Sequence, residues 1–243
     1  MGGWLPSPST QYPTPNIPEG EMTHTLHRQG SVESLKKDYC VLALVARQFD
    51  LKTEESKASA VERLRKISDV MAGNDPVNLG SIYVPGTYAH GLTSEQIKAG
   101  LKPNGFVLSV YDGKEKLKEV LSELKEKDFG ISITVSGLID EVFETCEEVG
   151  LAPHTISYSM GVWGKKSLLP KAEILEITSM CGHAMTSANL VKKAITDIKA
   201  GRTTAEAAAK GIAKPCACGC FNTSRATELL QQAASSSWLT ADG

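Results

Sequence analysis

The sequence lacks the features that mark membrane-bound and nucleic-acid-binding proteins. None of its 243 residues lie in a run approaching the about 18–20 consecutive apolar residues that span a bilayer. The 26 Lys and Arg residues against 28 Asp and Glu give a formal net charge of −2, and no basic block compensates locally. Such a balance provides no attraction toward phosphate backbones or anionic lipids. We therefore expect neither a nucleic acid nor a membrane as a partner.

Several catalytic signatures are missing as well. The chain contains no P-loop, no G-x-G-x-x-G after a strand, no G-x-S-x-G and no H-E-x-x-H. The sequence therefore gives no motif support for a nucleotide kinase, a nicotinamide dehydrogenase, a serine hydrolase or a zincin. The N-terminus also lacks the basic and apolar regions of a signal peptide. A cytoplasmic location is the expectation, and cytosolic thiols stay reduced unless they bind metal or turn over.

Composition and periodicity divide the chain into three parts. Residues 1–21 hold five of the eleven prolines and are expected to form a flexible tail. Residues 22–100 are expected to be helical, with one helix over 31–49 and another around 61–71 that together make a helical hairpin. A Thr93–Gln96 capping box predicts a further short helix up to about Ala99. Residues 101–243 form an α/β region that ends in a cysteine-rich segment, and they could be continuous with the region before them.

The α/β region alternates between strand and helix patterns. Strands are expected at 106–111, 131–135, 154–160 and 173–179. Helices are expected between the first three strands at 114–127 and 138–149, and after the strands at 183–199, 203–212 and 223–234. The predicted fold is therefore α/β or α+β, with a central β-α-β-α-β-β layered sheet unit, parallel crossovers, and C-terminal helices that carry the cysteine-rich loop.

Three of the six cysteines alternate within a single loop. Cys216, Cys218 and Cys220 follow Pro215, between two predicted helices. Alternate side chains of an extended or turning backbone leave on the same face, so the three thiols are expected to converge on one soft centre. Zinc and iron–sulfur sites more often use C-x2-C pairs, and C-x-C also suits Cu(I) or an oxidising disulfide. The spacing indicates thiol chemistry and leaves the metal open.

Cys181 lies between the predicted strand at 173–179 and the predicted helix at 183–199. A helix N-terminus at such a junction lowers the pKa of a thiol and favours the thiolate that binds metal or attacks a substrate. His183, two residues later, is a candidate acid/base or a further ligand. If the last helices fold back, Cys181, His183 and the loop thiols form one site.

Three other residues enter the argument with less support. His90 lies in the irregular segment 77–92 and is a second candidate acid/base, with a capping or surface role as the alternative. Cys40 and Cys146 each lie within an apolar or helical pattern. Both are expected to be ordinary packing cysteines rather than ligands.

These observations lead to one main hypothesis: a cytoplasmic enzyme with a cysteine-ligated metal centre. The metal is expected to be a 4Fe-4S cluster, with zinc as the alternative, bound by Cys181, Cys216 and Cys218, with Cys220 as a fourth ligand or a free thiol. His183 or His90 serves as acid/base. The reaction is an elimination, a hydration or a sulfur transfer on a small molecule, and an anionic substrate is one option.

Two alternatives remain open at this point. The first is a metal-free reductase or transferase that uses Cys181 as its nucleophile. The second is a non-catalytic iron–sulfur or zinc subunit or assembly factor, for which a protein partner or an oligomer is an option. Sequence alone does not separate a catalytic cluster from a cluster that relays electrons. The difference lies in whether one metal position is open to a substrate.

Overall fold

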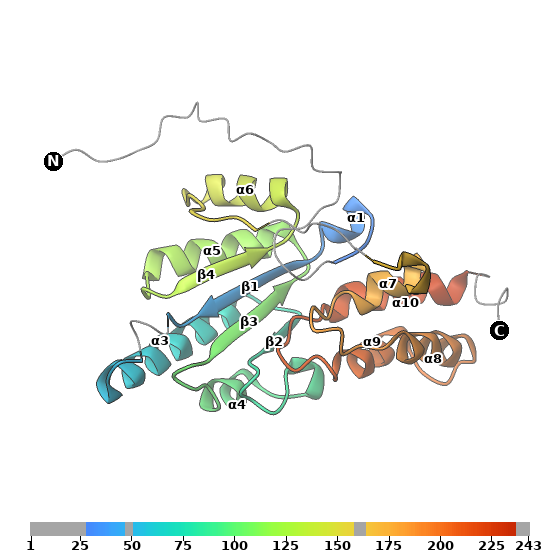
Figure 1. Ribbon diagram of the computed structural model, residues 1–243, viewed down its shortest axis with the longest axis horizontal. Helices are drawn as coiled ribbons and strands as arrows, with labels where there is room; N and C mark the ends of the chain where they lie inside the picture. Colours follow the sequence, from blue (N-terminus) through green and yellow to red (C-terminus); the bar gives the residue numbers. More distant parts are fainter. Residues whose placement is uncertain (1–27, 47–50, 158–163, 237–243) are drawn as a thin grey trace.

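The computed structural model describes residues 28–46, 51–157 and 164–236, so the expected tail at 1–21 lies outside the described residues. The described chain has a mixed α/β fold with four strands in one sheet, in the order β2-β3-β1-β4 (Figure 1). The strands are β1 (Tyr39–Leu44), β2 (Asn78–Gly80), β3 (Phe106–Tyr111) and β4 (Ser132–Ser136). Every neighbouring pair of these strands is antiparallel.

Helices outnumber strands in the described residues. The α-helices are α1 (Val32–Leu35), α3 (Glu54–Gly73), α4 (Ser94–Ala99), α5 (Lys114–Lys127), α6 (Ile139–Glu148), α7 (Ala172–Thr178), α8 (Ala188–Lys199), α9 (Ala205–Ala213) and α10 (Thr223–Ser235). Two 3-10 turns are η1 (Tyr88–His90) and η2 (Lys166–Leu168). In the portion of the chain that is described, no helix is both long enough and apolar enough to cross a bilayer.

The strand order arises from two split β-α-β units. Strands β1 and β2 are joined through α3 and run in the same direction, with β3 between them. Strands β3 and β4 are joined through α5 and also run in the same direction, with β1 between them. Of the expected crossovers, the one from 106–111 to 131–135 therefore exists, but it is split by the inserted antiparallel strand β1. The one through 138–149 does not exist, because residues 154–157 form no strand, and the crossover from β1 to β2 was not predicted. The sheet consequently mixes residues from before and after position 100.

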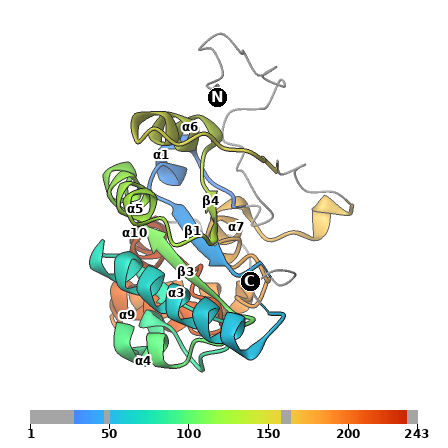
Figure 2. The same cartoon turned by 90° about the vertical axis from the view of Figure 1, so that its left-hand side faces the viewer.

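Helices cover both faces of the sheet (Figures 1 and 2). Alternate residues of a strand point to opposite faces. Tyr39 and Val41 of β1 belong to a core shared with α3 and α5. Cys40, between them, belongs to a second core shared with α7, α8, α9 and α10. All of the cysteines except Cys146 lie in this second core.

The first helix of the expected hairpin is wrong. Its described residues, 31–46, form the short helix α1 and then strand β1, whose first three residues are buried; residues 47–49 lie outside the described residues. The run YCVLAL fits this place because a central strand, covered on both faces, tolerates continuous apolar residues. The apolar spacings of three and four that predicted a helix were a coincidence of that run. The second helix is confirmed within α3, where Leu64, Ile67 and Met71 are buried.

The fourth expected strand is also wrong, because residues 173–179 form most of α7. Ile174 and Ile177 are fully buried and lie three residues apart, so one helical face carries the apolar contacts. Of the expected strand at 154–160, residues 154–157 form no strand and residues 158–160 lie outside the described residues.

The remaining elements of the α/β region are confirmed with small shifts at their ends. These are β3, β4, α5, α6, α9 and α10, together with α4, which begins at a Thr93–Gln96 capping box. The helix expected at 183–199 begins five residues late, because Ser187 caps α8 and residues 183–187 form a loop. Met185, which the helical pattern placed inside, is 53% exposed in that loop.

Candidate metal centre

The CACGC segment is a tight loop between α9 and α10, as the sequence predicts. The Cys216 N–H donates to the carbonyl of Ala213 at 2.9 Å, which turns the chain directly after α9. Gly219 has a φ of +86°, and a Cβ there would lie 2.7 Å from the backbone nitrogen of Gly80 in β2. Only glycine fits both requirements without strain. The loop is therefore pressed against the edge of the sheet.

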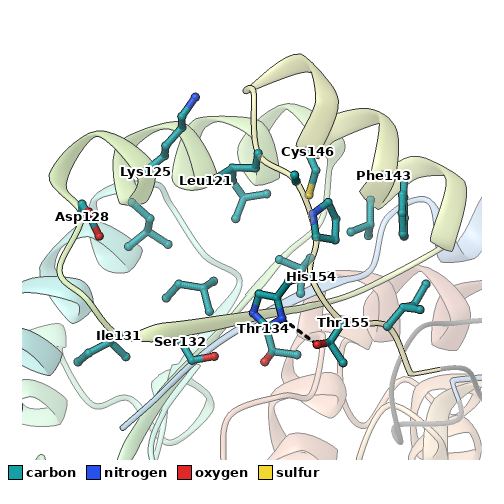
Figure 3. Close-up of a pocket in the computed structure, with 18 of the residues that line it drawn as sticks. Leu121, Lys125, Asp128, Ile131, Ser132, Thr134, Phe143, Cys146, His154 and Thr155 are labelled. Atoms are coloured by element: carbon teal, nitrogen blue, oxygen red, sulfur yellow. Dashed lines mark hydrogen bonds between the residues drawn. The ribbon is translucent and has the colours of Figure 1, made fainter. Parts of the chain in front are cut away.

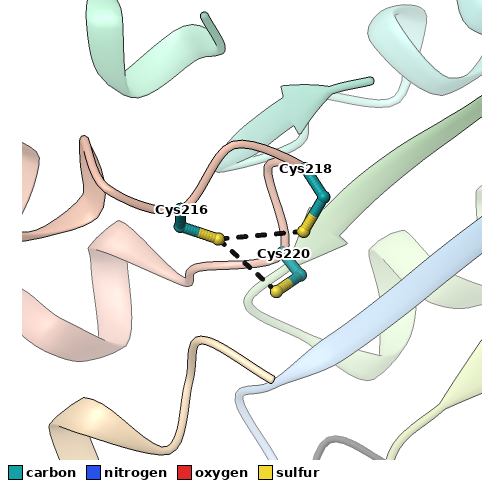
Figure 4. Close-up of side chains that lie close together, drawn as sticks. All are labelled: Cys216, Cys218 and Cys220. Carbon is teal, nitrogen blue, oxygen red and sulfur yellow. Dashed lines mark hydrogen bonds between the residues drawn. The ribbon is translucent and has the colours of Figure 1, made fainter. Parts of the chain in front are cut away.

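The loop brings its three thiols together (Figure 4). The Cys216 sulfur lies 3.6 Å from that of Cys220 and 3.8 Å from that of Cys218. All three sulfurs lie within 4.8 Å of one another, and none of the three residues is more than 2% exposed. These three residues make a group that could hold a metal ion. We refer to Cys216, Cys218 and Cys220 as the thiol triad.

Cys181 joins the triad from the loop that follows α7. It is 2% exposed, and its sulfur accepts a hydrogen bond from the thiol of Cys216. That bond, together with backbone N–H groups of Met185 and His183, outweighs burial and lowers the pKa of Cys181 to about 6. The sequence predicted a lowered pKa from a helix N-terminus. The donors instead belong to a loop, because α8 begins only at Ala188.

Backbone N–H groups also point at sulfurs inside the triad. The N–H of Gly182 donates to Cys220, and the N–H of Cys220 donates to Cys218. Contacts with the thiols of Cys216 and Cys218, with the Gly182 N–H and the charge of Arg28, hold the pKa of Cys220 below its usual range despite burial. Hydrogen bonds to sulfur favour the thiolate, which is the form that binds metal.

His183 lies over the triad on its solvent side. Its Nδ1 is 3.7 Å from the sulfur of Cys218, and the residue is exposed. The loop that carries it, residues 182–185, is exposed throughout, and it is fastened where the Thr186 hydroxyl donates to the carbonyl of Ile212 at 3.4 Å. The structure therefore brings Cys181, His183 and the thiol triad into one site.

His90 makes its hydrogen bonds within its own turn, η1. Its Nδ1 accepts from the Thr87 N–H at 3.1 Å and lies 3.2 Å from the Thr87 hydroxyl, so the ring closes the capping box of η1. This is the capping alternative that the sequence left open. A catalytic role for His90 stays a prediction, and neither of these two contacts involves a cysteine.

Three charged residues behind the triad were not identified by sequence reasoning. Arg28 donates through Nη1 to Asp38 at 2.6 Å and through Nη2 to the Cys40 sulfur at 2.8 Å and to the Cys220 carbonyl. Arg225 donates to the same Asp38 carboxylate at 2.9 Å. All three side chains are at most 1% exposed. Arg28 and Arg225 are 197 positions apart in the chain, so no local pattern pointed to them.

Cys40 is buried as expected, but it is more than a packing residue. Besides accepting from Arg28, its sulfur lies 3.8 Å from the Cys220 carbonyl. Burial raises the pKa of Cys40, which keeps it a neutral thiol beside the guanidinium. The same Arg28 thus contacts Cys40 on β1 and the backbone of the cysteine loop.

A separate cavity lies on the other side of the sheet. Its volume is about 560 Å³, and α5, α6, β4 and residues 151–157 surround it (Figure 3). Its wall is mainly apolar and includes Cys146 and His154. Burial raises the pKa of Cys146, in keeping with the packing role expected for it. The cavity shares no residue with the thiol triad.

Comparisons with known proteins add no assignment to this geometry. No family model, no curated protein and no solved structure matches the chain.

Proposed function

We propose that the chain is a metal-dependent enzyme with one metal ion, of the zinc type, bound by Cys216, Cys218 and Cys220. The observation that carries the proposal is the separation of the sulfurs, 3.6 Å and 3.8 Å from Cys216. Four sulfurs placed tetrahedrally at about 2.3 Å from one ion are about 3.8 Å apart. Two of the three sulfur separations in the triad therefore match the edges of such a tetrahedron, and the third is within 4.8 Å.

Cys181 is the proposed fourth and exchangeable ligand. It contacts Cys216 but comes from a different loop, and it does not belong to the compact group of three. Its loop is exposed from Gly182 to Met185, whereas the triad is enclosed by helices and by the sheet. Displacement of Cys181 would give a substrate a position on the metal from the solvent side, as catalytic zinc sites require.

His183 supplies the acid/base group in this proposal. Its ring lies beside Cys218 at the exposed edge of the site, where an entering small molecule would meet it. The metal would polarise an oxygen of the substrate, and His183 would take up or deliver the proton. Elimination or hydration of a small molecule, anionic ones included, is the reaction class that this pairing supports.

A 4Fe-4S cluster, the metal favoured by the sequence, is the second candidate. In its favour, backbone N–H groups of Gly182, His183 and Met185 are directed at cysteine sulfurs, and hydrogen bonds to sulfur set the potentials of such clusters. Against it, a 4Fe-4S cluster binds its cysteines through different irons, which spreads the sulfurs beyond the separations seen in the triad. The single ion therefore agrees better with the observed distances.

The proposal is tested by the metal content of three purified proteins. The wild-type chain, prepared without oxygen, is expected to hold one zinc per chain. Cys216→Ala removes the sulfur that contacts the other three and should abolish this binding. Cys146→Ala is the matched control, because it also removes a buried thiol but lies outside the site. It should keep the zinc.

Two results would contradict the proposal. Iron and acid-labile sulfide in place of zinc would establish the cluster. A wild-type protein that binds no metal, with thiol chemistry at Cys181 intact, would favour the metal-free reductase or transferase.

A further inference from the structure

The strongest feature outside the ligands is the buried guanidinium behind the cysteine loop. A metal ion with three or four thiolates carries a net negative charge, and burying such a charge is costly without a compensating partner. Positive groups within the core around the triad therefore matter. Lys37, near the same region, is exposed and pairs with Glu228, so it does not serve this purpose.

The two terminal nitrogens of the Arg28 guanidinium contact different groups. Nη1 holds the carboxylate of Asp38, while Nη2 faces the site and donates to the Cys40 sulfur and the Cys220 carbonyl. The negative charge of Asp38, with a contribution from Cys220, outweighs burial and raises the pKa of Arg28, so the guanidinium remains charged. The positive charge therefore lies directly behind one of the proposed ligands.

Arg225 provides an internal comparison. It binds the same Asp38, but its other donors go to the Ser34 hydroxyl at 2.9 Å and the Gln29 carbonyl at 2.6 Å. Its far side lies 3.9 Å from Glu176. None of these partners is a cysteine of the site. The two arginines are thus similarly buried and share one carboxylate, but it is Arg28 that donates to the cysteine loop.

We infer that Arg28 is the positioning residue of the metal centre: it fixes the Cys220 carbonyl and offsets the negative charge of the thiolates. This inference rests on the proposed metal centre and adds to it the residue that makes the loop a tight metal site. Residues that hydrogen-bond to metal ligands without binding the metal typically contribute about 10–100-fold in metal affinity. We expect Arg28 to contribute within this range.

The test compares zinc affinities, measured by competition with a chromophoric chelator, for three variants of the full chain. Arg28→Gln should weaken zinc binding about 10–100-fold. Arg28→Lys keeps the charge without the fork and should recover part of the affinity. Arg225→Gln also breaks a buried contact with Asp38, so it should lower the free energy of unfolding, yet it should leave the zinc affinity within a factor of about three of wild type.

The outcomes separate this inference from the proposed function. If wild type binds zinc and Arg28→Gln binds it equally well, the role of Arg28 is refuted and the metal centre stands. Equal weakening by Arg28→Gln and Arg225→Gln would reduce Arg28 to a structural residue. If Arg28→Gln does not fold, Arg28→Lys decides alone: a zinc affinity weaker than that of wild type but well above that of Cys216→Ala supports the inference. A loss as large as that of Cys216→Ala, or no loss in Arg28→Lys relative to Arg225→Gln, overturns it. A wild-type chain without zinc affinity would refute both.

Discussion

Cys216 is the residue on which the sulfur contacts converge. Its thiol touches Cys218, Cys220 and Cys181, and its side chain is fully buried. Packing alone gives a poor explanation of three such neighbours around one thiol, because thiols are weak hydrogen-bond donors and acceptors. A bound metal ion gives each sulfur a strong partner, and the surrounding N–H groups then hold the thiolates in place.

Cys181 should be dispensable for metal binding if it is the exchangeable ligand. We expect Cys181→Ala to retain at least about half of the metal content of wild type, since the three sulfurs of the triad remain. In the cobalt-substituted variant, azide should shift the visible absorption spectrum because the fourth position is open. Complete loss of metal in Cys181→Ala would show that four cysteines are required, as in a closed structural zinc site.

At the residue scale, the sequence identified the cysteines but not the charges. The C-x-C-x-C spacing sufficed to predict that the three loop thiols meet, whereas the approach of Cys181 depended on the last helices folding back. Arg28, Asp38 and Arg225 carry no local pattern, because their arrangement depends on how α10 packs beside β1. For His90, the sequence left a catalytic and a capping role open; the structure shows that its Nδ1 closes a turn, and the catalytic role stays a prediction.

The decisive element is the loop between α9 and α10. Asn222, which caps α10, donates to the Lys37 carbonyl at 2.8 Å and to Asp38 at 3.0 Å. Asn78 of β2 donates to the Phe221 carbonyl at 2.9 Å. The loop is therefore held from two sides by buried amides, and its cysteines start from a fixed backbone. Such preorganisation lowers the entropic cost of binding a ligand.

Gly219→Ala tests how closely this loop is fitted. The residue has a φ of +86°, and a Cβ would meet the backbone nitrogen of Gly80 at 2.7 Å, so both conformation and space oppose alanine. We expect the free energy of unfolding, measured by urea denaturation, to fall by about 1–3 kcal/mol. Zinc binding should weaken at the same time.

Gly211→Ala is the matched control for that change. Gly211 lies within α9 and has no positive φ, and a Cβ added there would meet no atom within 4 Å. Alanine there should be neutral or should stabilise the helix by up to about 1 kcal/mol. Equal effects of the two substitutions would contradict the close fit of the loop against β2.

At the element scale, amphipathic patterns with clear caps were predicted well. Helix α5 has the expected bounds, and α4 begins at its capping box. The failures were short apolar runs, in which periodicity does not separate a buried strand from a helix. YCVLAL became the central strand β1, and EILEIT became the helix α7. In both cases the tertiary environment decided the outcome.

At the scale of the whole molecule, the sheet separates two cores. The face that α3 and α5 cover contains Cys146 and the cavity, and the face that α7–α10 cover contains the thiol triad. Segments from both ends of the described chain meet at the second face, where Arg28 contacts the Cys220 carbonyl. The order of the strands was not predictable from the sequence, because inserting β1 between β3 and β4 depends on contacts between distant residues.

X-ray absorption spectroscopy of the wild-type protein distinguishes a single zinc ion bound by cysteines from any other centre. A zinc edge with sulfur ligands at about 2.3 Å is expected, with loss of that signal in Cys216→Ala and its retention in Cys146→Ala. An iron edge with iron neighbours would contradict the single-ion centre, and so would a zinc coordinated without sulfur.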